Sequence, residues 1–287
     1  MEGKYILQQL TTRQLVCEHF KKQFALPARQ PIWPDPEARA LDRPITADEL
    51  AGADVLAPEL AALLNAKFER GEPLDLGEGT SLYLPKPNKP RGECSSLRPI
   101  VLFNSIRKAI SLLVLNRISP AVNGFLSPHQ SGFRKARNTA DAVWTHRWLC
   151  ARTQRFKETI HVLGIDLSRV FDTIDRTKLI ATLKEFLTDD EIRLIKLLLA
   201  YTPLALRVNG GQAMDPFESN TGTCQGDSLS PVLFVVYLEA ALRDVAKELS
   251  VPYPLLEQMV VYADDADFIC HDPAIIELVL HTKTGNL

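Results

Sequence analysis

The stretch from Gln258 to Cys270 constrains the fold more strongly than any other part of the sequence. Two short apolar runs, residues 259–261 and 268–270, flank Tyr262-Ala-Asp-Asp265. Apolar runs of this length around a polar bend predict a tight β-hairpin with two adjacent carboxylates at its tip. Adjacent carboxylates repel each other unless a cation neutralises them, and Mg²⁺ prefers such hard oxygen ligands. A solvated Asp-rich turn is the alternative, since turns favour aspartate.

Length and composition limit the class of protein. The chain has 287 residues, 46% of them hydrophobic, which predicts one large or two small domains with a buried core. No apolar run approaches the ~18 residues of a membrane span, and the first residues lack the features of a signal peptide. We therefore expect an intracellular protein without a membrane partner; nuclear or cytoplasmic placement and the oligomeric state stay open. Five dispersed cysteines predict reduced thiols rather than disulfides or a structural zinc site.

The distribution of charge is more informative than the formal net charge of −2. Between Lys86 and Arg137 the chain carries ten basic residues and one acidic residue, Glu93. A segment this basic inside a neutral chain predicts binding to a polyanion. A solubilising surface is the alternative, although such surfaces usually mix both signs of charge.

The first half of the chain predicts short helices followed by strands. Residues 1–78 read as an N-terminal extension with a Pro-rich connector. We expect helices around Thr11–Phe24, after the capping-box spacing Thr46–Glu49, and over residues 106–118, the last closing near Pro120. The predicted strands cover residues 81–84 and 98–102. Gln130–Arg137 predicts a basic loop, and a further helix begins at Thr139.

The second half alternates strands and helices. Residues 161–165 predict a buried strand that ends at Asp166, and residues 204–208 predict a strand that leads into the hairpin signal Asn209-Gly210. Asp175 and the capping box Thr188–Glu191 open two helices, and Ser230-Pro231 opens a long one that reaches about Leu249. The pattern predicts an α+β fold, an antiparallel sheet with helices packed on one face.

Phosphoryl transfer between nucleotides needs two metal ions a few ångström apart, and hence aspartates from different strands that converge. Asp166 closes one apolar strand and Asp264 lies on the hairpin, 98 residues later. That separation is long enough for the two strands to be neighbours in one sheet. The sequence therefore predicts a two-metal site at these strand ends.

Six short motifs follow one another in the sequence: Tyr83-Leu-Pro-Lys-Pro87, Arg98-Pro-Ile100, Gln130-Ser-Gly-Phe-Arg134, Asp166-Leu-Ser-Arg-Val-Phe-Asp172, Thr223-Cys-Gln-Gly-Asp-Ser-Leu-Ser-Pro231 and Tyr262-Ala-Asp-Asp265. In this order and at this spacing they resemble the polymerase core of reverse transcriptases from non-LTR (LINE-like) retrotransposons. The resemblance covers roughly residues 79–270. The resemblance implies a right-hand polymerase fold, with fingers over residues 79–160 and a palm over residues 161–287. It also implies an enzyme that adds dNTPs to the 3′-OH of a DNA primer on an RNA template.

The resemblance assigns roles to individual residues. Asp166 and Asp264 would bind two Mg²⁺ ions, or Mn²⁺, with Asp265 the less directly liganded acid. Phe171 would exclude a ribose 2′-OH, with core packing as its alternative role. Gln225 and Gly226 would line the nascent base pair, where glycine permits close approach of the backbone. The cations follow: Lys86 and Arg98 for the incoming triphosphate, and Lys89, Arg91, Arg134 and Arg137 for the template backbone.

Departures from the family leave the activity of this chain open. Asp267 adds a third acid near the hairpin tip, which either competes for metal or is solvated. Reverse transcriptases continue past the hairpin into a thumb, whereas this sequence ends at Leu287, so we expect a core truncated before the thumb. The rival hypothesis is a non-catalytic retroelement remnant that binds RNA or serves as a structural module. A nucleotide cyclase would also need paired acids, but it would not explain Gln225–Pro231 or the basic segment.

Overall fold

The computed structural model describes most of the chain, in two compact units. Unit 1 comprises Met1–Ser119 and Phe171–Ser230, and unit 2 comprises Pro120–Val170 and Pro231–Leu287. Both units are discontinuous in sequence, so neither follows the predicted boundaries of fingers and palm, which stay a prediction. The described residues are 16–24, 38–50, 56–72, 74–87, 89–90, 93–167, 170–200, 202–207, 214–248, 259–274 and 276–277.

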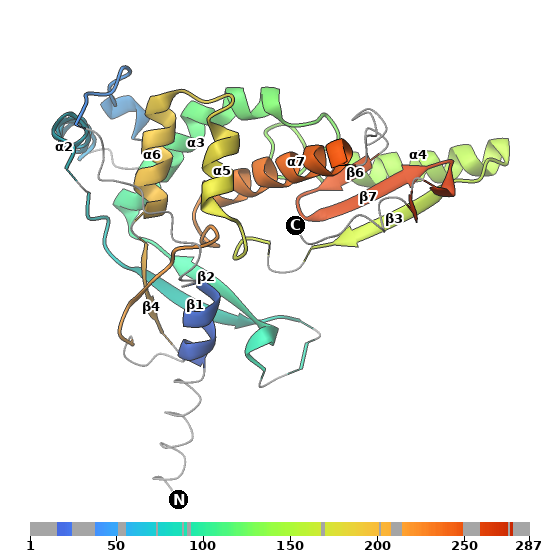
Figure 1. Cartoon of the computed structure of the whole chain (residues 1–287), viewed down its shortest axis with the longest axis horizontal. Coiled ribbons are helices and arrows are strands. Elements are labelled where there is room, and N and C mark those ends of the chain that lie inside the picture. Colours follow the sequence, from blue (N-terminus) through green and yellow to red (C-terminus); the bar gives the residue numbers. More distant parts are fainter. Residues whose placement is uncertain are drawn as a thin grey trace, which may run out of the picture. The chain divides into compact units, whose positions relative to one another are not determined.

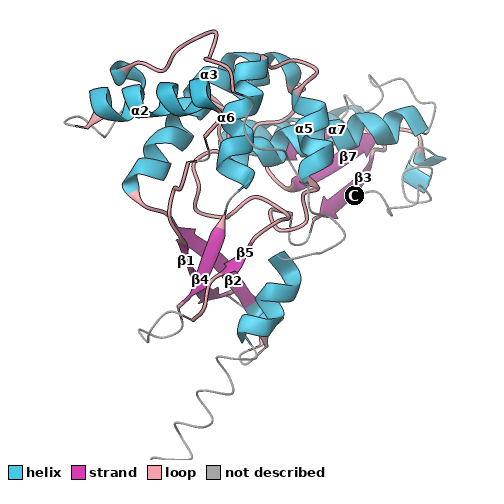
Figure 2. Cartoon of the chain, turned by 60° about the vertical axis from the view of Figure 1, so that its left-hand side comes forward, coloured by secondary structure: helices cyan, strands magenta, loops and turns pink. Residues whose placement is uncertain are grey.

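Unit 1 contains a four-stranded sheet in the order β2-β1-β4-β5 (Figure 2). β1 pairs antiparallel with β2 and parallel with β4, while β4 pairs antiparallel with β5. The strands are β1 (Gly79–Pro85), β2 (Leu97–Leu102), β4 (Pro203–Leu206) and β5 (Phe217–Glu218). The strands predicted over residues 81–84 and 98–102 are confirmed, and β4 confirms the start of the third. The hairpin signal at Asn209-Gly210 lies outside the described residues.

The core of this sheet is covered by a helical segment, residues 16–24. Its aromatic side chains Phe20 and Phe24 are nearly inaccessible to solvent and pack with Val101, Leu204 and Phe217 from the strands. Each buried aromatic ring removes a large apolar area from water, which stabilises the unit by roughly 2 to 3 kcal/mol per side chain. The described part of the helix predicted at Thr11–Phe24, residues 16–24, is thus an integral part of the sheet domain.

Two further helices of unit 1 begin where their capping residues predict. Asp175 accepts hydrogen bonds from the amides of Thr177 and Lys178, and the Thr188 and Glu191 side chains form the predicted capping box. The box at Thr46 is also present, but it opens only one 3₁₀ turn. The elements are η2 (Ala47–Glu49), α2 (Ala57–Arg70), η3 (Cys94–Ser96), α5 (Arg176–Leu183) and α6 (Asp189–Ala200).

Helix α3 (Ser105–Phe125) is longer than the sequence predicts. Pro120 lies inside it rather than closing it, so that prediction is wrong. A proline removes one main-chain hydrogen bond from a helix, but packing can hold the next turn. Val122 and Leu126, beyond the proline, are both at most 5% exposed, and this burial maintains the helical turn.

Unit 2 is built on an antiparallel sheet in which β7 lies between β3 and β6 (Figure 1). The hairpin of β6 (Met259–Tyr262) and β7 (Asp265–Cys270) confirms the prediction for residues 259–270. β3 (His161–Asp166) also forms as predicted. It is not a buried strand, however, because Val162 is 51% exposed on the edge of the sheet.

Two long helices lie mainly in the described part of unit 2. α7 (Ser230–Glu248) begins at the predicted Ser230-Pro231 and is buried along most of its length, for example at Leu233 and Val236. α4 (Thr139–Phe156) begins at an unpredicted Asn138 cap and has no buried residue. No helix in the described residues is long and apolar enough to cross a membrane.

Candidate active site

The turn between β6 and β7 carries the adjacent acids. Tyr262 and Asp265 are cross-strand partners, so Ala263 and Asp264 alone form the connection. Ala263 has φ +57°, in the left-handed region, and is buried, whereas Asp264 is half-buried and Asp265 exposed. The hairpin thus presents two carboxylates at its tip, as its sequence predicts.

The third predicted acid lies on the neighbouring strand. Asp166, the last residue of β3, is the direct Cα partner of Asp265 in β7. The backbone therefore brings these positions side by side across 99 residues of sequence, although the side chain of Asp166 lies outside the described residues. Register places Asp265, rather than Asp264, opposite Asp166.

Asp267, the third acid near the hairpin tip, contacts helix α4 rather than the acids at the turn. Its Oδ2 lies 2.9 Å from His146 Nε2 on α4, and its Oδ1 lies above Gly164 of β3. A Cβ on Gly164 would approach that oxygen to 2.9 Å. The contact with His146 gives Asp267 a structural partner, separate from the pair at the turn.

The loop predicted from Gln130 to Arg137 reaches the same hairpin. Gln130 forms an isolated bridge with Val261 of β6, and its side-chain amide is hydrogen-bonded to Ala263. Arg134 donates to the carbonyls of Ser127 and Gln130 and to the side chain of Asn123. These contacts favour a structural role for Arg134, while Arg137 is exposed.

In unit 1, Phe171, the residue predicted to exclude a ribose 2′-OH, is hydrogen-bonded to the motif that begins at Thr223. The Phe171 carbonyl accepts a 2.7 Å hydrogen bond from the amide of Thr223. Gly222 has φ +68°, and a Cβ there would lie 2.5 Å from the Phe171 carbonyl oxygen. Only glycine fits this approach, which fixes the half-buried Phe171 beside the loop.

The following loop residues contact strand β2. The amide of Val101 donates to the carbonyl of Gln225 at 2.7 Å. Gly226 has φ +114°, and a Cβ would lie 2.2 Å from the Val101 carbonyl oxygen. The structure therefore brings Phe171, Gln225 and Gly226 onto one scaffold with β2, the strand that carries Arg98.

A buried arginine holds this loop, and no local sequence pattern predicts that role. The Arg176 guanidinium, 3% exposed, donates to the carbonyls of Gly222, Leu199 and Ser219 at 2.7–2.8 Å. A longer bond of 3.3 Å reaches the Thr221 carbonyl. Burial lowers the pKa of Arg176 to about 10, so the group stays protonated at neutral pH. Helix α5 thereby anchors the irregular backbone that precedes Gln225.

The predicted triphosphate-binding cations lie on the β1–β2 hairpin. Arg98 is exposed and pairs across the strands with Leu84. Lys86 follows β1, and its ammonium donates to the Ser95 carbonyl at 3.3 Å. Lys89, predicted to contact the template, is exposed, and Arg91 lies outside the described residues.

Two arginines of the basic segment Lys86–Arg137 have structural roles. The segment is therefore not the one continuous polyanion-binding surface that its charge alone suggests. Arg107 is 3% exposed and donates to the Leu198 carbonyl and to Thr202. Arg117 is 8% exposed and forms a fork with both carboxylate oxygens of Glu49, at 2.9 and 2.6 Å. That hydrogen bonding lowers the pKa of Glu49. Both arginines are therefore unavailable to a polyanion.

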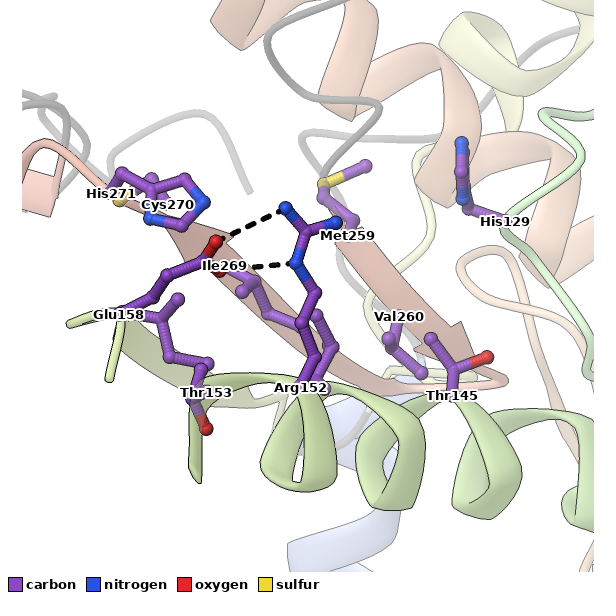
Figure 3. A pocket seen from close by; sticks show the side chains of 12 residues that line it. His129, Thr145, Arg152, Thr153, Glu158, Met259, Val260, Ile269, Cys270 and His271 are labelled. Carbon is purple, nitrogen blue, oxygen red and sulfur yellow. Dashed lines mark hydrogen bonds and ion pairs between the residues drawn. The ribbon is translucent and has the colours of Figure 1, made fainter. Parts of the chain in front are cut away.

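A cavity of about 250 Å³ lies where α4 faces β6 and β7. Figure 3 shows Arg152 reaching over it to Glu158, with Nε to Oε2 at 3.0 Å and Nη2 to Oε1 at 3.3 Å. The hydrogen bond from Arg152 lowers the pKa of Glu158. None of the predicted site residues lines this cavity, so the candidate chemistry stays at the hairpin turn.

The arrangement of motifs is matched by a known family. Residues 84–283, more than half of the chain, match the family model described as "Reverse transcriptase (RNA-dependent DNA polymerase)". The chain belongs to the reverse transcriptase family. This confirms the kinship expected from the six motifs, and members of the family use divalent metal ions and a nucleic-acid template.

Curated relatives of this reverse transcriptase chain come from mobile elements. It is 29% identical over 188 residues to the probable RNA-directed DNA polymerase from transposon BS of Drosophila melanogaster, covering 64% of this chain and 20% of that protein. It is 24% identical over 196 residues to the RNA-directed DNA polymerase from mobile element jockey of Drosophila funebris, covering 67% and 21%. The chain thus spans about a fifth of the length of these relatives.

Solved structures support the polymerase fold. Telomerase from Candida albicans, in complex with a fragment of telomeric RNA, superposes with a TM-score of 0.51 at 14% identity. The match covers 71% of this chain and 39% of the telomerase chain. With the mixed helices and antiparallel pairing described above, it confirms the predicted α+β right-hand polymerase class.

Proposed function

We propose that this chain carries the catalytic core of an RNA-directed DNA polymerase, which adds dNTPs to the 3′-OH of a DNA primer on an RNA template. The observation that carries the proposal is the register of Asp166 with Asp265, next to the turn residue Asp264. Family motifs that are far apart in sequence converge there as acids on adjacent strands.

The chemistry of these residues suits divalent metal. Carboxylates are the hard oxygen donors that Mg²⁺ prefers, and Mn²⁺ accepts the same donors. Within the described residues no lysine, arginine or histidine forms an ion pair with Asp264, and its half-buried position leaves it accessible to a cation. We assign the binding of two metal ions to Asp166, Asp264 and Asp265. When bound, such ions lower the pKa of the attacking hydroxyl and offset charge on the phosphates.

The nucleotide-binding roles are assigned to residues of unit 1. Phe171 would contact the sugar of the incoming dNTP, and Gln225 and Gly226 its base pair. The supporting observation is that one hydrogen-bonded scaffold holds Phe171 through Thr223 and Gln225 through Val101. Lys86 and Arg98, on the hairpin attached to that scaffold, would bind the triphosphate, for which a guanidinium offers bidentate contacts.

Template contacts are assigned to the exposed cations. Lys89 and Arg137 are both exposed, and Arg91 follows Lys89 closely in sequence. Contacts of this kind with the phosphate backbone carry no sequence information and weaken steeply with salt. Arg134 retains only part of its donor capacity for such a role, because most of its N–H groups are used within the protein.

The proposal is tested by extension of a labelled primer on an RNA template with Mg²⁺ and dNTPs. Asp264→Asn removes a carboxylate charge and should reduce extension about a thousand-fold, or about 4 kcal/mol of barrier. Asp267→Asn is the matched control. It makes the same chemical change two strand positions from Asp265, on a side chain paired with His146, and should retain activity within about three-fold.

The result that contradicts the proposal is equally concrete. A folded wild-type chain that binds RNA but extends no primer would favour a non-catalytic RNA-binding remnant. Equal activity of the wild type and Asp264→Asn would remove the acids from the mechanism.

A further inference from the structure

The side chain of Gln130 forms hydrogen bonds with both main-chain groups of Ala263, in the turn of the proposed catalytic hairpin. Its Oε1 accepts from the amide of Ala263 at 3.0 Å, and its Nε2 donates to the Ala263 carbonyl at 3.2 Å. Oε1 also accepts from the amide of Gly132 at 2.7 Å. Two N–H groups aimed at one oxygen fix the orientation of the amide, since its NH₂ group could accept neither.

The main chain on either side of Gln130 forms further hydrogen bonds with strand β6. The amide of Val261 donates to the His129 carbonyl at 3.3 Å, and the Val261 carbonyl accepts from the amide of Ser131 at 2.8 Å. Gln130 and Ser131 are at most 6% exposed. Because the segment lies against the last residues of β6, it holds the base of the turn as well as its tip.

Gly132 makes the close approach possible. A Cβ at this position would lie 2.2 Å from the Ala263 nitrogen and 2.7 Å from its Cα. These are main-chain atoms with no freedom to move aside, so any side chain would push the loop away from the turn. The glycine of the motif Gln130-Ser-Gly132 is therefore required by contact with the hairpin.

The turn has reason to need such support. Ala263 has φ +57°, a conformation that brings the Cβ of an L-residue too close to the following carbonyl oxygen and is therefore strained. Hairpin turns commonly place glycine, asparagine or aspartate there instead. Two buried hydrogen bonds between Gln130 and Ala263 offset this strain and leave one arrangement of the backbone from which Asp264 and Asp265 project.

We infer that Gln130 is a positioning residue for catalysis, holding Ala263 in its left-handed conformation so that the carboxylates of Asp264 and Asp265 are preorganised for metal. The inference rests on the proposed function. The arginines of the Gln130–Arg137 loop are expected to contact the template. The inference gives Gln130 and Gly132 of the same loop a different role, that of supporting the active-site hairpin. Supporting groups of this kind typically change metal affinity or activity 10- to 100-fold when removed.

The test replaces Gln130 by methionine, which keeps the length of the side chain and removes the amide. Gln154→Met, the same change at an exposed position on α4, is the matched control. For Gln130→Met we expect kcat for nucleotide addition to fall about 10- to 100-fold, with KM for dNTP and RNA affinity within about two-fold of wild type. Binding of Mn²⁺ alone, followed by electron paramagnetic resonance, should weaken by about ten-fold.

A second variant separates positioning from stability. Adding Ala263→Gly to Gln130→Met removes the steric cost of the left-handed turn, so kcat and Mn²⁺ affinity should partly recover. Unchanged Mn²⁺ affinity in Gln130→Met, or parallel losses of kcat, dNTP binding and RNA binding, would overturn the inference. If the wild-type chain extends no primer, the proposed function fails, while the Mn²⁺ titration still decides whether Gln130 organises the carboxylates.

Discussion

The turn at Ala263 in unit 2 and the loop from Ser219 to Gly226 in unit 1 solve one problem in two ways. Each is irregular backbone with a left-handed residue, Ala263 or Gly222, and each is held by one buried side chain. Gln130 holds the turn with a neutral amide, whereas Arg176 holds the loop with a guanidinium. The difference follows from what the backbone presents.

The turn offers one N–H and one carbonyl of the same residue, and a primary amide matches that pair. The loop offers several carbonyls and no N–H to the side chain that holds it, which suits the five donors of a guanidinium. A site that offers mainly carbonyl oxygens therefore suits arginine even without a carboxylate partner. The amide holds a single residue, and the guanidinium holds a whole segment.

The largest expected effect comes from removing the guanidinium. Arg176→Met removes the guanidinium donor from the buried carbonyls of Gly222, Leu199 and Ser219, and should lower the free energy of unfolding by about 3 to 5 kcal/mol. Urea denaturation measures this. Lys178→Met, an exposed change on the same helix, should cost less than about 0.5 kcal/mol. A decrease of less than 1 kcal/mol in the free energy of unfolding of Arg176→Met would mean that the loop keeps its conformation without the guanidinium.

Replacing Gly222 or Gly132 by alanine tests separately the close approach in the loop of unit 1 and the one at the turn of unit 2. Gly222→Ala and Gly132→Ala both force a Cβ against main-chain atoms, at 2.5 and 2.2 Å, and should each cost about 2 to 3 kcal/mol by urea denaturation. Gly124→Ala, whose Cβ meets nothing within 4 Å, is the control and should be slightly stabilising.

These glycine variants also sharpen the comparison between the two regions. Only Gly132→Ala should weaken Mn²⁺ binding, since Gly222 belongs to the loop beside Phe171. Weakened binding in both variants would show that the two regions are not independent.

The smallest expected effect is that of Ala263→Gly alone. Glycine removes the left-handed penalty of about 1 to 2 kcal/mol but adds about 0.5 to 1 kcal/mol of chain entropy in the unfolded state. Stability should therefore rise by about 0.5 kcal/mol in the same denaturation assay. A loss greater than 1 kcal/mol would show that the methyl group of Ala263 is needed for packing.

The local elements that carry the predicted site residues were predictable from the sequence, because each depends on residues close to it in the chain. The acids, the hairpin and the helix starts at Asp175, Thr188 and Ser230 depend on neighbours a few residues away. Arg107, Arg117 and Arg176 were not predictable in this way. Their hydrogen-bond partners lie 23 to 95 residues away in the sequence. Nothing in the sequence around a buried arginine distinguishes it from an exposed one.

Pro120 and Gln130 show the same limit from different sides. A proline usually ends a helix, but α3 continues past Pro120 because Val122 is buried in the folded protein. The glutamine belonged to a motif that was recognised, but its partner Ala263 lies 133 residues away. Local pattern assigns a residue to a motif, and only the fold shows which other motif it contacts.

The pairing of residues 129–131 with β6 also determines how this sheet can associate. An edge strand with unpaired amides and carbonyls is a template for another chain. At Val261 both outward main-chain groups are already bonded to the 129–131 segment, which closes this part of that edge. In the described residues β3 is then the open edge, so a strand added from a second molecule would lie alongside the backbone that ends in Asp166.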